Sequence, residues 1–127
     1  MSQEIRRRLA VYRSYAPPVE VAGRTVVIID AGLASGFTAA AVKSLRSRQA
    51  ERIFVAAPVA SRSAVDMLQG QTDEVIALHV CRLGSFAVAG FYKRWHDLTD
   101  DEVIEYLREW LARMISVKGG QVGNIPG

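Results

Sequence analysis

The stretch VVIIDAGLASGFTAAAV, Val26 to Val42, decides the fold of this 127-residue chain. It opens with a continuous β-branched run, Val26–Ile29, which suits a strand buried on both faces of a parallel sheet. The run ends at Asp30, two glycines bracket a loop of small residues, and Thr38 opens a segment rich in helix-forming alanine. The order strand, loop, helix therefore predicts an α/β protein.

The loop combines an acid with an anion-binding backbone. The free N–H groups and the positive dipole end of a helix N-terminus bind anions, and small residues such as Gly32 and Gly36 allow close approach. Ser35 and Thr38 add hydroxyl groups at the rim. Asp30 cannot hold a phosphate, but its carboxylate can accept hydrogen bonds from ribose hydroxyls. The pattern indicates a sugar-phosphate site, and a plain structural connector is the open alternative, since neither GxGxxG nor a P-loop is present.

The same residues resemble the phosphoribosyl pyrophosphate (PRPP) motif of type I phosphoribosyltransferases, in which a hydrophobic strand runs into two adjacent acids and a loop containing Thr-Gly-x-Thr. One predicted-phosphoribosyltransferase subfamily has a motif that reads roughly DDGIATGAT, where this chain has DAGLASGFT (Asp30–Thr38). Further segments carry the resemblance: IRRRLAVYRS, RIFVAAPVAS, DEVIAL, and SFAVAGFYKRW followed by LTDDEV. It covers nearly the whole chain, up to about Trp110.

The resemblance implies a partial type I phosphoribosyltransferase-like fold: a three-layer α/β architecture with a mainly parallel sheet flanked by helices. It implies a single domain over residues 1–118, equivalent to the C-terminal half of the family domain, followed by a mobile tail at 119–127. It assigns no catalytic residue and no protein metal ligand, and Mg²⁺ is expected to come with PRPP. The implied PRPP- or phosphate-binding residues are Asp30, Ala31, Gly32, Leu33, Ala34, Ser35, Gly36, Phe37 and Thr38.

Three departures from the family pattern leave enzymatic activity open. Ala31 replaces the second acid and Ser35 replaces a threonine, and in the family both acids are understood to contact the ribose hydroxyls. Only residues 1–25 precede Val26, where relatives carry the pyrophosphate-binding loop and a flexible covering loop. The first hypothesis is a phosphoribosyltransferase, a glycosyltransferase of nucleotide metabolism. The alternative is a catalytically inactive module that binds phosphate or nucleotide and acts in regulation or oligomerisation.

Composition fits a compact domain whose basic first half could attract a nucleic acid or any other phosphorylated ligand. The chain is 50% hydrophobic and 23% charged. Residues 1–62 carry ten Lys and Arg against four Asp and Glu, whereas residues 63–127 carry six against nine. The basic residues are not interleaved with aromatics, so a solvated face is favoured over a nucleic-acid site. With no apolar segment of 18 residues and no secretory signal, the expected location is cytoplasmic, without a membrane.

The rest of the chain predicts alternating helices and strands. The periodicity predicts helices at residues 2–15 and up to about Ser47, strands at 53–58 and 74–80, and between the strands a short helix capped within 60–63. A capping box of Thr99 and Glu102 opens a last, packing helix. Parallel strands with right-handed crossovers follow, and three central strands leave an exposed edge. The expected partner is therefore a second copy, or a chain that supplies the missing half.

Aromatic and basic residues cluster before the last helix. Phe86, Phe91 and Tyr92 could stack on a base, although packing of this segment onto the sheet is the favoured alternative. The single cysteine, Cys81, excludes an internal disulfide and is interpreted as a small core residue near a strand end. His79 and His96 lack the neighbouring ligands of a metal site, and each is interpreted as structural or solvated.

Overall fold

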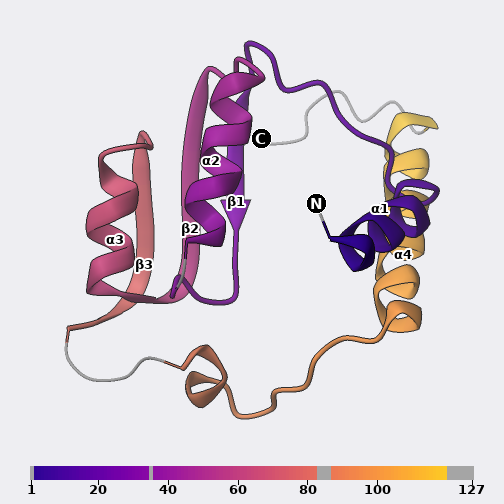
Figure 1. Ribbon diagram of the computed structural model, residues 1–127. Coiled ribbons are helices and arrows are strands. Elements are labelled where there is room, and N and C mark those ends of the chain that lie inside the picture. Colours follow the sequence, from indigo (N-terminus) through magenta and orange to yellow (C-terminus); the bar gives the residue numbers. More distant parts are fainter. Residues whose placement is uncertain (1, 35, 83–86, 120–127) are drawn as a thin grey trace. The chain divides into compact units, whose positions relative to one another are not determined.

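The computed structural model describes residues 2–34, 36–82 and 87–119 (Figure 1). The chain divides into two compact units, one of Glu20–Trp95 and one of Met1–Val19 with His96–Gly127. A division into compact units does not decide whether they fold together, so the single domain of residues 1–118 stays a prediction. The predicted mobile tail lies, from residue 120 onward, outside the described residues.

The first unit is built on three parallel strands. They are β1 (Thr25–Ile29), β2 (Arg52–Ser61) and β3 (Glu74–Cys81), in the order β1-β2-β3. Helix α2 (Phe37–Ser47) connects the first two strands, and α3 (Arg62–Gln69) connects the last two. Successive right-handed crossovers in one direction place both helices on the same face of a sheet, as Figure 1 shows. The predicted α/β fold with a parallel sheet is confirmed, and this unit by itself has two layers.

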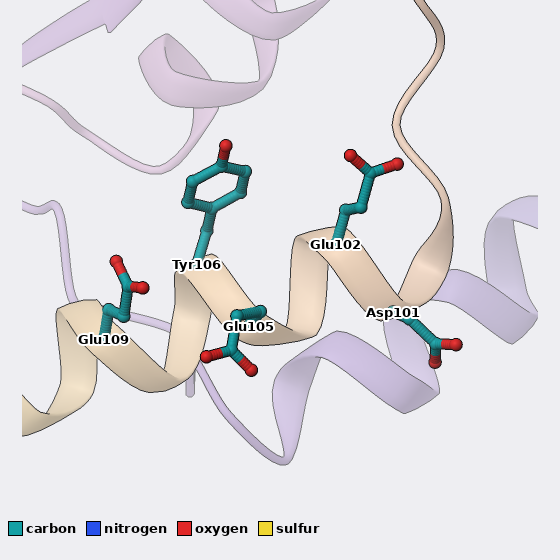
Figure 2. Close-up of a pocket in the computed structure, with 5 residues that line it drawn as sticks. All are labelled: Asp101, Glu102, Glu105, Tyr106 and Glu109. Carbon is teal, nitrogen blue, oxygen red and sulfur yellow. The ribbon is translucent and has the colours of Figure 1, made fainter.

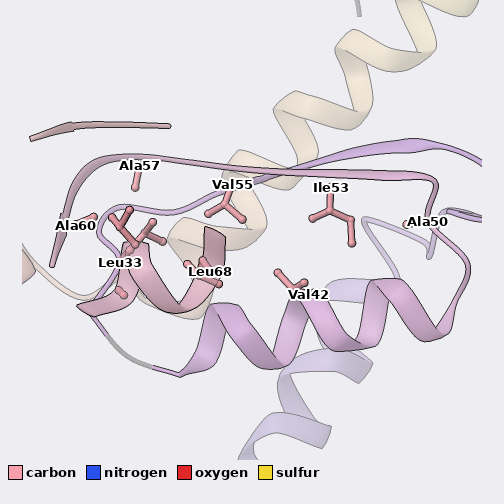
Figure 3. Close-up of a cluster of buried hydrophobic side chains, with 10 residues drawn as sticks. Leu33, Val42, Ala50, Ile53, Val55, Ala57, Ala60 and Leu68 are labelled. Atoms are coloured by element: carbon pink, nitrogen blue, oxygen red, sulfur yellow. The ribbon is translucent and has the colours of Figure 1, made fainter. Parts of the chain in front are cut away.

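The hydrophobic core lies between the sheet and its two helices (Figure 3). β2 is the central strand, and its Val55 lies opposite Ile28 of β1 and Val75 of β3. The side chains of Val42 from α2 and Leu68 from α3 point toward the strands. The buried cluster comprises Leu33, Val42, Ala50, Ile53, Val55, Ala57, Ala60, Ala64, Val65 and Leu68. The predicted packing faces of both helices are therefore confirmed.

The second face of the sheet is exposed, which corrects one prediction. The β-branched run predicted that β1 is buried on both faces, but Ile29 is 81% exposed and Val27 is exposed as well. On β3, Leu78 is 86% exposed. Inward and outward residues alternate along β1 because successive side chains of a strand point to opposite faces. A hollow of about 280 Å³ on this face is lined by Ile29, Ala56, Ala57, Pro58, Ile76 and Leu78.

The second unit contains α1 (Gln3–Arg13) and α4 (Asp100–Gly119), which polar contacts join at the start of α4. The Tyr12 hydroxyl donates to Asp100 Oδ1 at 2.7 Å, and Arg7 Nη2 donates to Asp100 Oδ2 at 2.8 Å. These two donors, the Tyr12 hydroxyl first, hold the pKa of Asp100 below its usual range. Within the described part of the chain, no helix has the length and apolar character needed to cross a bilayer.

Two helix starts predicted from capping residues are confirmed. Ser61 precedes α3, and its hydroxyl accepts a hydrogen bond from the Ala64 amide at 3.2 Å. At the start of α4, the Thr99 amide donates to the Glu102 carboxylate at 3.1 Å, and the Glu102 amide donates to the Thr99 hydroxyl at 3.2 Å. The ring of His96 lies 2.9 Å from the same Glu102 carboxylate. Capping is readable from sequence because both partners lie within one turn.

Replacing Leu68 by alanine should destabilise the sheet unit strongly. Leu68 is fully buried between α3 and the sheet, so its removal leaves a cavity and lowers the free energy of unfolding by about 2–5 kcal/mol. Urea denaturation measures the loss. Met67→Ala is the matched control, because Met67 is next to Leu68 in the sequence and its side chain is exposed. This variant should change the free energy of unfolding much less. Equal losses in the two variants would contradict the packing described for α3.

Replacing Tyr12 by phenylalanine should raise the pKa of Asp100 toward its ordinary value, because the variant lacks the hydroxyl donor. A carboxyl ¹³C NMR titration measures this pKa. A carboxyl group with a lowered folded pKa stabilises the fold above its unfolded pKa of about 4, and this contribution is lost as the pH falls through the folded pKa. Tyr12→Phe should therefore reduce the acid dependence of stability. The control is Tyr106→Phe, an exposed tyrosine on α4, which should leave the titration of Asp100 unchanged. An unchanged pKa of Asp100 in Tyr12→Phe would contradict the hydrogen bond between Tyr12 and Asp100.

Candidate functional site

The loop that follows β1 is fixed to β2 through Leu33. The Leu33 amide donates to the Val59 carbonyl at 3.0 Å, and the Ser61 amide donates to the Leu33 carbonyl at 2.9 Å. The Leu33 side chain is 1% exposed and inserts into the core (Figure 3). The sequence pattern ends β2 at Pro58, but the strand continues three residues further, because these residues pair both with Leu33 and with His79–Cys81 of β3. The loop is therefore part of the folded core.

Asp30 lies directly after the last residue of β1, and its carboxylate turns toward the loop. Its Oδ1 accepts a hydrogen bond from the Gly32 amide, and its Oδ2 accepts one from the Thr38 hydroxyl, both at 3.3 Å. Thr38 lies in the first turn of α2 and is 6% exposed. Both distances are at the long end of the hydrogen-bonding range. A carboxylate has about four lone-pair sites, so Asp30 can accept a hydrogen bond from a ligand hydroxyl as well. The structure thus joins the acid and the last hydroxyl of the predicted site.

The first turn of α2 offers free backbone donors beside that carboxylate. Gly36 is the N-cap residue and makes no side-chain capping bond, and the first turn contains no acid. The N–H groups of a first helical turn have no carbonyl partner within the helix, and the positive end of the helix dipole lies there. An adjoining hollow of about 250 Å³ is lined by Ala34, Gly36, Ser63, Ala64 and Met67. This end of α2 therefore favours an anion.

A larger hollow along α4 has the opposite electrostatic character (Figure 2). It measures about 400 Å³ and is lined by Asp101, Glu102, Glu105, Tyr106 and Glu109. Figure 2 shows Glu102 and Tyr106 on one side of the helix, and Asp101 and Glu105 turned away from them. Carboxylates repel a phosphate, so this hollow does not suit the predicted ligand. Nowhere in the described ranges do three or more His, Cys, Asp or Glu side chains gather as metal ligands.

The aromatic segment packs onto the loop and the sheet. A 3₁₀ turn, η1 (Val88–Phe91), precedes Tyr92, whose hydroxyl donates to the Ala31 carbonyl at 2.6 Å. The ring of Phe91 lies 5.7 Å from the ring of His79 on β3. Packing, the favoured alternative, is thus observed for both aromatics, and a role in base stacking stays a prediction. The predictions for Phe86 and Ser35 fall outside the described residues.

Leu33 and Tyr92 illustrate what sequence reasoning missed. The motif predicts Leu33 only as a member of the loop, although a single large apolar side chain among small residues signals an anchor in the core. The contact of Tyr92 with Ala31 has no local signal, because 61 positions separate the two residues. The position of Val88 next to Gly32 also has no local signal, because the two residues lie far apart in the sequence.

Adding a methyl group at position 32 should destabilise the protein, because Gly32 faces η1 without spare room. An added Cβ would lie 2.5 Å and 2.7 Å from the two methyl groups of Val88. Gly32→Ala should therefore lower the free energy of unfolding by about 1–3 kcal/mol, and adding Val88→Ala to it should recover part of that loss. Gly70→Ala, with nothing within 4 Å of its Cβ, is the control in urea denaturation. Additive losses in the double variant would contradict this steric explanation.

Known proteins resemble this chain in sequence and in structure. Two proteins from different strains of Mycobacterium tuberculosis are 34% identical to it over 105 residues, which are 82% of this chain and 24% of theirs. They carry the names "Putative phosphoribosyl transferase Rv0571c" and "Putative phosphoribosyl transferase MT0597". The chain is thus similar in sequence to part of these proteins. The resemblance predicted from the motif is thereby confirmed, although no protein-family model matches the sequence.

A crystal structure supports the fold of this chain. The structure of TT1426 from Thermus thermophilus matches it with a TM-score of 0.76 and 36% identity. The match covers 84% of this chain and 51% of that one. This chain thus spans about half the length of the solved protein and about a quarter of the length of the curated relatives.

Proposed function

We propose that this chain binds PRPP, or a nucleoside 5′-phosphate, at the loop Asp30–Thr38. The observation that carries the proposal is the hydrogen bond from Thr38, in the first turn of α2, to the carboxylate of Asp30. It places a hydroxyl-accepting carboxylate beside a helix N-terminus that favours an anion, which are the two groups that a sugar phosphate needs. The names of the relatives support the same ligand class.

The backbone N–H groups at Gly36 and in the first turn of α2 hold the 5′-phosphate in this proposal. They have no carbonyl partner within the helix, and Gly36 at the N-cap has no side chain that could cap them. The Thr38 hydroxyl has one proton, which it donates to Asp30. A bound phosphate therefore competes with Asp30 for that proton, and the long 3.3 Å contact makes the exchange inexpensive. The predicted contact of the Ser35 hydroxyl with the phosphate belongs to the same proposal.

Asp30 accepts hydrogen bonds from the ribose hydroxyls and stabilises positive charge during transfer. In that reaction, the bond from ribose C1 to the pyrophosphate oxygen breaks and the oxygen keeps the electron pair. A bond from C1 to a nitrogen of the acceptor base forms, and the proton that this nitrogen loses passes to solvent water. The carboxylate favours the oxocarbenium character that develops at the ribose ring. In this proposal Mg²⁺ enters as part of the substrate, on its pyrophosphate.

Binding without transfer is the second candidate function. It is favoured by Ala31, which leaves one carboxylate in the motif where the resemblance implies two. Loss of one ribose hydrogen bond to a carboxylate costs about 1–3 kcal/mol, which weakens binding without abolishing it. For either function we also propose a cytoplasmic location. We further propose association with a second copy, or with a chain that supplies further parts of the longer relatives. Turnover assays with purine and pyrimidine bases separate the two functions.

A glutamate at position 36 should abolish or strongly weaken ligand binding. Nothing lies within 4 Å of a Cβ built at Gly36, so the variant should fold, but its carboxylate repels the phosphate. Isothermal titration calorimetry of Mg·PRPP and of AMP should show saturable binding to the wild type and at least tenfold weaker binding to Gly36→Glu, about 1.4 kcal/mol or more.

Gly70→Glu is the matched control for this experiment. It adds the same charge at a position that is equally open, but Gly70 ends α3 at the opposite edge of the sheet. This variant should bind like the wild type. Equal weakening in both variants would contradict the location of the site. Absence of binding to a folded wild type would contradict the proposed function.

A further inference from the structure

The peptide group between Ala31 and Gly32 is held at both of its polar ends. Its carbonyl, on Ala31, accepts the 2.6 Å hydrogen bond from the Tyr92 hydroxyl. Its N–H, on Gly32, donates to Asp30 Oδ1 at 3.3 Å. Two hydrogen bonds to one peptide plane fix its rotation, and a hydrogen bond to the carbonyl strengthens the N–H as a donor. Tyr92 is thus linked to the Asp30 carboxylate through a single peptide group.

The neighbourhood of Tyr92 keeps its hydroxyl in place. The Tyr92 ring packs against the ring of Trp95, with the centroids 5.2 Å apart. On the other side of the contact, Val88 fills the space next to Gly32, so η1 and the loop lie against each other. Because the two segments are already packed, forming a short hydrogen bond between them costs little further conformational entropy. It therefore acts as a fixed support for the loop.

We propose that Tyr92 is a positioning residue that orients the Asp30 carboxylate through the Ala31–Gly32 peptide group. The consequence for ligands rests on the proposed function, in which Asp30 accepts the ribose hydroxyls. Tyr92 then contributes to affinity without touching the ligand, since its hydroxyl is already engaged by Ala31. This role differs from the base stacking that the sequence suggested for Tyr92.

The first test needs no ligand. Tyr92→Phe keeps the ring and its packing on Trp95 but removes the donor. Amide hydrogen exchange of Gly32, followed by NMR, should become about three- to tenfold faster in this variant, because the peptide group loses one of its two restraints. Tyr106→Phe, an exposed tyrosine on α4, should leave the exchange unchanged. An unchanged rate in Tyr92→Phe would overturn the proposal.

The second test links the contact to the ligand. Calorimetric titration with Mg·PRPP should show about three- to tenfold weaker binding to Tyr92→Phe than to the wild type. Incorporation of 4-aminophenylalanine at position 92 restores an N–H donor at the same place, and it should restore both the slow exchange and the affinity. A merely bulky role for Tyr92 would give no difference between phenylalanine and its amino derivative.

The outcomes separate this proposal from the proposed function. Faster exchange with weaker binding, both restored by the amino derivative, supports the proposal. Faster exchange with unchanged affinity overturns the role of Tyr92 toward the ligand. Absence of PRPP binding to the folded wild type overturns the proposed function and, with it, that ligand role, whereas the exchange rates still decide whether Tyr92 holds the loop.

Discussion

The insertion of Leu33 into the core is the constraint on which the candidate site depends. A loop of small residues has little side-chain surface of its own to hold it in place, and its backbone would otherwise exchange among many conformations. Two backbone hydrogen bonds to β2 and a fully buried side chain make Leu33 a fixed point in the middle of that loop. The groups on either side, Asp30 before it and the start of α2 after it, are then held at a set separation.

The elements that were predictable depend on residues close together in the sequence. The helix caps at Ser61 and Thr99 involve partners within three positions, and the burial of Val42 follows from helical spacing. The end of β2 was not predictable, because its last residues pair with the loop around Leu33, which lies far away in the sequence. Local patterns thus locate elements well, and long-range pairing sets their ends.

The exposed face of the sheet shows a different limit of sequence reasoning. A β-branched run indicates that a strand has apolar side chains on both faces, but it does not indicate which elements cover each face. In the sheet unit, both crossover helices pack on one face, as the order of the strands requires. The outward side chains of β1 and β3, Ile29 and Leu78 among them, consequently remain exposed. The apolar character was predicted correctly, and the burial was not.

The candidate site combines a short hydrogen bond to its backbone with two longer hydrogen bonds to the carboxylate of Asp30. Asp30 and Thr38 were predictable because they belong to one motif, whereas the support from Tyr92 comes from a segment 61 positions away. The 2.6 Å bond from Tyr92 ends on the peptide backbone, and the 3.3 Å contacts end on the carboxylate of Asp30. The short bond fixes the peptide group next to Asp30, and the carboxylate keeps lone pairs that its two donors do not use. A fixed backbone beside a carboxylate with spare acceptor sites is the arrangement that the proposed binding of ribose hydroxyls requires.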